Sequence, residues 1–143
     1  MRAMGLDLGT KTIGVAISDP MYWIAQAYTT IQRTNLQEDL KSIQEIVDKE
    51  GVQEVVLGLP WNMNHSQGAA ADRTKTFGQA LARFLGREVI YQDERLSTVS
   101  AERILQESGV RREKRKKHVD KIAATFILQV WLDERATRQK TND

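Results

Sequence analysis

The sequence predicts an α/β fold in which a mixed sheet of five strands begins antiparallel, ends parallel and is flanked by helices. Three short apolar segments open the chain, and two further ones alternate with segments of helical periodicity. Strands separated by a helix indicate parallel crossovers. The 143 residues, 41% of them hydrophobic, have the size and composition of a single domain. We therefore expect one domain over residues 1–143, with about 137–143 forming a disordered tail.

The strands are predicted from short apolar runs and the turns between them. Partly β-branched runs at 3–8 and 13–17 flank a polar turn and are typical of a hairpin. Residues 23–31 give a third strand candidate with weaker alternation. The near-continuous apolar run at 52–59 is typical of a strand covered on both faces, and 88–92 supplies the fifth strand.

Helices are predicted between and after these strands. The first follows the candidate caps Thr34 and Asn35 and ends at Gly51, the second ends at Gly86, and a third spans 97–109. A last helix follows the basic segment described below. The expected apolar stripes are Leu36, Leu40, Ile43 and Val47 in the first helix, Phe77, Leu81 and either Phe84 or Leu85 in the second, and Val119, Ile122, Ala123, Phe126, Ile127 and Val130 in the last.

Composition excludes several classes of protein. The chain has no cysteine, no apolar run near the length of a membrane span, and no signal-peptide pattern in its first residues. We therefore expect a soluble cytoplasmic protein with no membrane partner. The net charge is only +2, yet residues 111–117 (RREKRKK) carry +5, which leaves −3 elsewhere. This concentration indicates a polyanionic partner, with a solvated loop as the ordinary alternative.

Carboxylates stand at three places where a strand ends or a helix begins. Asp7 lies near the end of the first strand, Asp93 and Glu94 follow the fifth, and Asp120 lies near the start of the last helix. Such groups are costly near a core unless paired or bound to cations, so their convergence would suggest a Mg²⁺ site. Each also has an ordinary explanation, because Asp7 and Asp93-Glu94 could sit in turns and Asp120 could complement the helix dipole.

Aromatic and histidine residues give weaker signals. An exposed indole can stack on an unpaired base, and Trp61 is a better candidate for this contact than Trp23. Trp131 lies beside the stripe of the last helix and is expected to pack. His65 and His118 are too few and too far apart to predict a zinc site.

Four motifs in order span nearly the whole chain. They are GLDLGTKTIGVAISDP at 5–20, GLPWNM at 58–63, DERLST at 93–98 and KRKKHVDKIAATFIL at 114–128. Together they resemble the YqgF-type family of Holliday junction resolvases, also described as nucleases that process the 5′ end of precursor 16S ribosomal RNA. The resemblance implies a ribonuclease H-like fold similar to that of the RuvC resolvase, with strands 1–3 antiparallel and strands 4–5 parallel.

The resemblance also implies roles for individual residues. Asp7, Glu94 and Asp120 would be the catalytic acids and would hold two Mg²⁺ or Mn²⁺ ions, with Asp93 as the alternative to Glu94. The residues expected to bind nucleic acid are Lys11, Trp61, Asn62, Arg95, Arg111, Arg112, Lys114, Arg115, Lys116 and Lys117.

The loop after GLP departs from the family pattern. Two basic positions usual there are absent, since Trp61 and Gly68-Ala69-Ala70 stand in their place. Arg73 or Lys75 could compensate in part. The departure bears on phosphate binding by this loop and leaves the acids unaffected.

The predicted function is metal-dependent hydrolysis of phosphodiester bonds, with processing of the 5′ end of pre-16S rRNA favoured. One ion would activate water and the other would stabilise the leaving 3′-oxygen. One alternative is a Holliday junction resolvase, whose symmetric cuts require a dimer. Another is a catalytically silent nucleic-acid-binding or ribosome-assembly module. An actin-like ATPase would need two lobes, for which 143 residues are too few.

The expected partners follow from these functions. They are structured RNA such as pre-rRNA, branched DNA, and ribosomal precursor particles. The chain itself would be a monomer or a homodimer.

Overall fold

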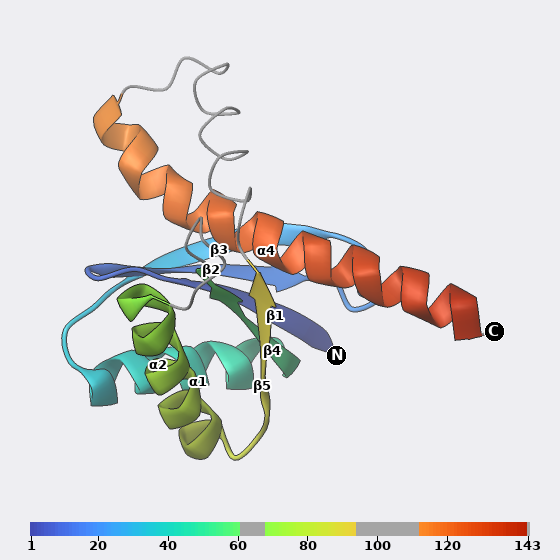
Figure 1. Cartoon of the computed structure of the whole chain (residues 1–143), viewed down its shortest axis with the longest axis horizontal. Helices are drawn as coiled ribbons and strands as arrows, with labels where there is room; N and C mark the ends of the chain where they lie inside the picture. Colours follow the sequence, from blue (N-terminus) through green and yellow to red (C-terminus); the bar gives the residue numbers. More distant parts are fainter. Residues whose placement is uncertain (61–67, 94–111, 143) are drawn as a thin grey trace.

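The computed structural model describes residues 1–60, 68–93 and 112–142, except for the side chains of 112–121 and 138–142. Over these residues it shows one sheet in the order β3-β2-β1-β4-β5, with α1 and α2 on one face and α4 on the other (Figure 1). The predicted mixed α/β sheet is confirmed, and the third predicted helix lies outside the described residues. Within the described ranges, no helix is long and apolar enough to cross a membrane.

The sheet joins an antiparallel half to a parallel half. Strands β1 (Arg2–Leu8), β2 (Thr12–Ser18) and β3 (Ala25–Gln32) pair antiparallel, as the predicted hairpin requires. Strands β4 (Val52–Leu59) and β5 (Val89–Asp93) extend the sheet parallel to β1. The carboxyl ends of β1, β4 and β5 therefore meet at one edge, which is where α/β sheets collect ligands.

β3 begins at Ala25, two residues later than predicted, because the preceding turn is held by a side chain. The carboxylate of Asp19 accepts the backbone N–H groups of Met21, Trp23 and Ile24 at 2.7 to 3.1 Å. These hydrogen bonds, that of Ile24 foremost, lower the pKa of Asp19. Because these N–H groups already have a partner, the residues stay in the turn and do not extend the strand.

The predicted helix boundaries agree with the cap geometry. α1 (Leu36–Glu50) begins after Asn35, whose side chain accepts a backbone N–H of the first turn. α1 ends at Gly51 and α2 (Ala69–Leu85) ends at Gly86, with φ values of 65° and 67° that favour glycine. The two helices pack on the same face of the sheet (Figure 1).

Two hydrophobic cores cover the two faces of the sheet. In β1 the even-numbered Met4 and Leu6 face α1 and α2, while Ala3 faces α4. Leu85 completes the stripe of α2 on the first core, whereas Phe84 is 38% exposed. The other buried members of the first core are Ile13, Val15, Ile17, Leu40, Ile43, Val47, Val52, Val55, Leu57, Phe77, Leu81 and Val89.

α4 (Arg112–Asn142) lies on the opposite face, and its sheet-facing side differs from the predicted stripe. Val130 is 39% exposed, so its predicted place in the stripe is wrong. A Cβ on Gly5 would lie only 2.7 Å from the Cβ of Leu128 and 2.9 Å from the carbonyl oxygen of Ala124, so this glycine lets the helix approach through those two residues. The α4 residues in the second core are Ala124, Ile127, Leu128, Trp131 and Leu132.

The replacement of Gly5 by alanine tests this close approach. Either the strand or the helix would have to move to admit the methyl group, and overpacking of this kind typically costs about 1–3 kcal/mol. We expect Gly5→Ala to lower the free energy of unfolding by that amount in urea denaturation. An unchanged denaturation midpoint would contradict the packing described.

Candidate active site

Asp7 lies at the edge where the parallel strands end. It is half-buried near the carboxyl end of β1 and is opposite Gly14 of β2. On the β4 side of β1, Leu6 pairs with Leu57, so Asp7 comes level with Gly58. The first predicted acid thus stands where residues of neighbouring strands can share a ligand.

Strand alternation separates Asp7 from Asp93. Successive residues of a strand point to opposite faces, so Asp7 shares the α4 face with Ala3 and Gly5. Asp93 pairs with Leu59, which by the same alternation belongs with the strand residues that face α1 and α2. Asp93 is therefore in register with the face opposite to that of Asp7.

The direction of α4 brings its first turns toward Asp7. Its middle lies over β1 at Gly5, where Ala124 makes the close contact. Further along, Gln129 accepts the backbone N–H of Ala25 at 2.8 Å, at the far edge of the sheet. α4 therefore runs against the direction of β1 while it crosses obliquely toward β3, and Figure 1 shows the opposed directions.

Position 120 comes over the end of β1 as a consequence. It precedes Ala124 by about one helical turn, or roughly 6 Å, on the same side of the helix. Asp7 follows Gly5 by two strand residues, again roughly 6–7 Å in the same direction. Residues from opposite ends of the chain thus reach one edge and one face of the sheet.

The other predicted site residues lie in the β1–β2 turn, in the first turns of α4, or outside the described residues. Lys11 is exposed in the β1–β2 turn, four residues after Asp7. The basic positions 112 and 114–117 belong to the first turns of α4, at the same end of that helix as position 120. No cluster of three or more metal-ligating side chains occurs among the described residues. The predicted site residues outside the described range are Trp61, Asn62, Glu94, Arg95 and Arg111.

The described tryptophans lie away from Asp7. Trp131 is 5% exposed and packs near Tyr22, as expected for a core residue. Trp23 is 72% exposed, but it lies in the β2–β3 turn at the opposite edge. Stacking by Trp23 would therefore occur far from the strand ends.

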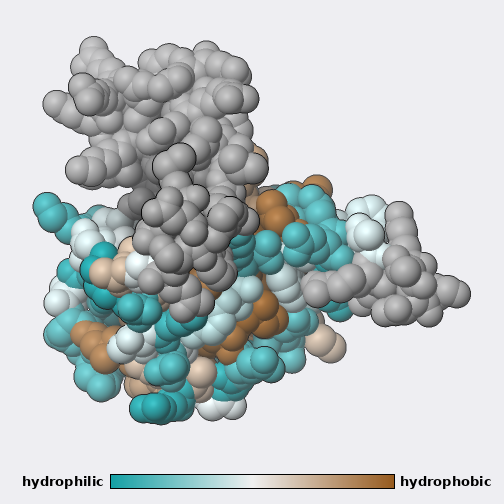
Figure 2. All heavy atoms as spheres, in the orientation of Figure 1, coloured by the Kyte–Doolittle hydropathy of each residue, from teal (hydrophilic) through white to brown (hydrophobic). Residues whose placement is uncertain are grey.

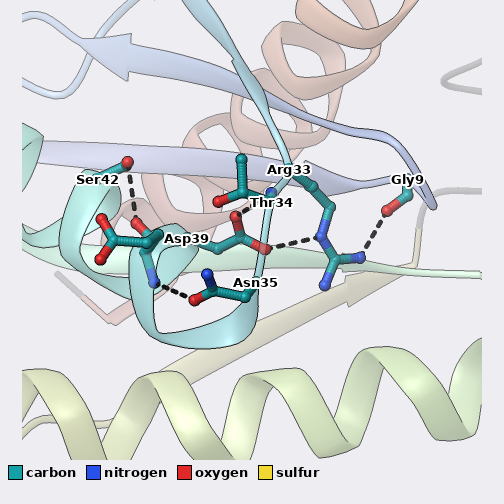
Figure 3. Close-up of polar contacts among 7 residues, drawn as sticks. Gly9, Arg33, Thr34, Asn35, Asp39 and Ser42 are labelled. Carbon is teal, nitrogen blue, oxygen red and sulfur yellow. Dashed lines mark hydrogen bonds and ion pairs between the residues drawn. The ribbon is translucent and has the colours of Figure 1, made fainter.

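A polar network behind the β1–β2 turn is not predicted by the sequence (Figure 3). Arg33 donates from Nε to the Asp39 carboxylate at 3.0 Å and from Nη1 to the carbonyl oxygen of Gly9 at 2.9 Å. Asp39, only 2% exposed, also accepts the backbone N–H of Thr34 at 3.1 Å. The guanidinium lies 5.5 Å from the ring centroid of Phe77 on α2. The network ties the turn next to Asp7 to α1 and α2.

The sequence signal for this network is ambiguous. An aspartate in the first turn of a helix is ordinarily explained by the helix dipole. Only the fold shows that Asp39 is buried and faces Arg33, which stands six residues earlier.

Solved structures with similar topology define the fold. Thermus thermophilus RuvC in complex with a Holliday junction substrate aligns with a TM-score of 0.60 over 96% of both chains, at 13% identity. The fowlpox virus Holliday junction resolvase aligns with a TM-score of 0.53, covering 94% of this chain and 99% of the viral one, at 15% identity. The fold is therefore the ribonuclease H-like fold of RuvC-type resolvases.

Sequence relatives identify the family. The RuvX model, described as Holliday junction resolvase, matches residues 1–134. The "Putative pre-16S rRNA nuclease" of Moorella thermoacetica is 51% identical over 133 residues, covering 93% of this chain and 95% of that protein. A relative of the same name from Caldanaerobacter subterraneus subsp. tengcongensis is 53% identical over 134 residues, with 93% and 96% covered. The chain belongs to the RuvX family, and the predicted phosphodiester-hydrolysing enzyme is confirmed.

The Arg33–Asp39 pair generates a stability prediction. Removing the Asp39 carboxylate leaves the Arg33 guanidinium, whose side chain is 25% exposed, without its charged partner, and hydrogen bonds to charged groups contribute about 1.5–3 kcal/mol. We expect Asp39→Ala to reduce the free energy of unfolding by that amount in urea denaturation. The neighbouring Glu38→Ala serves as the control, because Glu38 only pairs with Lys41 on the exposed surface and such pairs contribute less than about 1 kcal/mol. Equal effects of the two substitutions would contradict the assigned role.

Proposed function

We propose that the protein is a divalent-metal-dependent nuclease that acts in the cytoplasm on the 5′ end of pre-16S rRNA. One observation carries the proposal: Asp7 and position 120 of α4 reach the same edge and the same face of a ribonuclease H-like sheet. The curated relatives named as pre-16S rRNA nucleases support this choice of substrate. Ribosomal precursor particles would then be the setting in which the enzyme meets its substrate.

The metal ligands in this proposal are Asp7, Glu94 and Asp120. Three carboxylates form a donor set suited to Mg²⁺ or Mn²⁺, which prefer oxygen ligands. Glu94 is favoured over Asp93 because Asp93 is in register with the opposite face of the sheet. When bound, a pair of such ions can activate water and stabilise the leaving oxygen of a phosphodiester.

Basic residues would hold the nucleic acid beside these acids. Lys11 is exposed in the turn that follows β1, and the positions of residues 114–117 are in the first turns of α4. Lysine and arginine bind phosphates with little regard for sequence. Trp61 and Asn62 from the loop after β4, together with Arg95 and Arg111, complete the proposed contact surface.

A charge-removing substitution tests the catalytic assignment. Asp7→Asn changes the volume very little, so it should abolish cleavage of a pre-16S rRNA fragment in Mg²⁺ and in Mn²⁺ while the protein remains folded. Asp48→Asn, on the exposed surface of α1, provides the matched control and should cleave as the wild type does. Mapping the ends of the products identifies the cleaved bond. A fully active Asp7→Asn protein would overturn the assignment.

The basic positions of α4 generate a prediction on salt dependence. Replacement of Lys114, Arg115, Lys116 and Lys117 by glutamine removes as many as four phosphate contacts. For single-stranded RNA the slope of log Kd against log salt should then fall by as much as about 3. Binding is measured by fluorescence anisotropy, with Lys41→Gln/Lys49→Gln on α1 as the control. An unchanged slope in the fourfold variant would remove this segment from the proposed surface.

The second candidate function is resolution of Holliday junctions. The description of the RuvX family favours it. Symmetric resolution requires two active sites and hence a dimer. Incubation with a synthetic junction, together with sedimentation at micromolar concentration, separates the two functions. A stable monomer that cuts only rRNA supports the first function, and a dimer with paired symmetric cuts supports the second.

A further inference from the structure

The face of the sheet opposite to the proposed metal site carries a cavity. Its volume is about 730 Å³, within the range of about 300–1,000 Å³ that is typical of small-ligand sites. It lies where the β1–β2 turn meets the starts of α1 and α2, and Figure 2 shows an apolar area at the left of the molecule over this region. The apolar walls include Leu8, Leu36, Pro60, Phe77 and Ala80.

Two arginines give this apolar cavity a polar side. Arg33 is held in place by two hydrogen bonds. Its Nε donates to the Asp39 carboxylate, and its Nη1 donates to the carbonyl oxygen of Gly9. In Figure 3 the remaining guanidinium nitrogen points away from both partners, and no described residue accepts a hydrogen bond from it. Arg73 is exposed and also lines the cavity, as does its exposed acidic neighbour Asp72. A flat, mostly apolar ligand with a carbonyl acceptor and a nearby negative charge would suit this arrangement.

The cavity adjoins the proposed metal site along the chain. Leu8 and Gly9, which line it, directly follow Asp7. Because side chains alternate along β1, Asp7 faces α4 while Leu8 faces the cavity side. Pro60, another wall residue, ends the neighbouring strand β4 at the same edge. A nucleotide chain that crosses this edge would meet the carboxylate and the cavity together.

We propose that the cavity receives one unpaired nucleobase of the RNA strand beside the scissile phosphate. This proposal rests on the nuclease function proposed above. The apolar walls pack against the base, as is usual where proteins bind unpaired bases. The remaining guanidinium nitrogen of Arg33 donates to a carbonyl oxygen or ring nitrogen of the base, and Arg73 contacts the adjoining phosphate. The cavity thus sets which nucleotide flanks the cleaved bond.

Filling the cavity tests the proposal in a binding assay that needs no cleavage. Thr76 is an exposed lining residue of α2, so Thr76→Trp occupies the cavity from its rim. Gln79→Trp adds the same side chain at an exposed position of α2 that does not line the cavity. Both are made in the Asp7→Asn protein, and anisotropy measures Kd for a pre-16S rRNA fragment with single abasic sites tiled across the cleaved bond.

We expect an abasic site to weaken RNA binding at one position of the fragment only. One abasic site should weaken binding about tenfold in the Asp7→Asn parent, which is near the lower end of the effect of losing one protein-bound base. Thr76→Trp should weaken binding of intact RNA by a similar factor and abolish the effect of that abasic site, while Gln79→Trp should behave as the parent. No effect of any abasic site, or unchanged abasic sensitivity in Thr76→Trp, would overturn the proposal.

Two further measurements separate a folding defect from a loss of base binding, and the cavity proposal from the nuclease function. If Thr76→Trp does not fold by circular dichroism, Ala70→Trp fills the cavity from another exposed lining position and must give the same pattern. Cleavage by the protein with Asp7 intact is assayed separately. Absence of cleavage with retained base-dependent binding would reject the nuclease function alone, whereas cleavage indifferent to every abasic site would reject the base cavity alone.

Discussion

The contact between β1 at Gly5 and α4 at Ala124 and Leu128 is the constraint on which the rest of the site depends. Because glycine has no side chain, the helix backbone lies almost directly on the strand. The antiparallel course of α4 then decides which of its turns reaches the edge where β1, β4 and β5 end. Position 120 comes over that edge as a result, and the turns of α4 that carry the basic segment continue beyond it (Figure 1). In the proposed site, this packing contact in the core would bring position 120 of α4 to Asp7 of β1.

The end of β1 is held from the other face as well. Arg33, fixed by the buried Asp39, binds the carbonyl oxygen of Gly9 in the turn that follows Asp7. A carboxylate that binds metal must keep its position within a fraction of an ångström, and support from packed neighbours provides this. In the proposed mechanism, the two faces of the sheet also have different functions. The phosphate would be cleaved on the α4 face, while a base would be held on the α1/α2 face.

Much of the fold could be predicted because local signals agree with it. The strand ending at Pro60 and the helices ending at Gly51 and Gly86 follow from turn and cap chemistry that the sequence displays directly. Features that depend on distant partners could not be predicted. The exposure of Val130 depends on how α4 packs over Gly5, which the sequence of the helix does not show. The choice between Asp93 and Glu94 as metal ligand depends on the register of β5 on β4.

The central claim is that metal ions bind at the carboxyl ends of the parallel strands, on the α4 face. Paramagnetic broadening of backbone amide signals by Mn²⁺ locates such ions directly. The account predicts strong broadening of Leu8 and Gly9 in the wild type, its loss in Asp7→Asn, and little effect at Trp23, which is more than about 13 Å away along β2. Broadening centred on the turn at Trp23, or unaltered broadening in Asp7→Asn, would contradict the account.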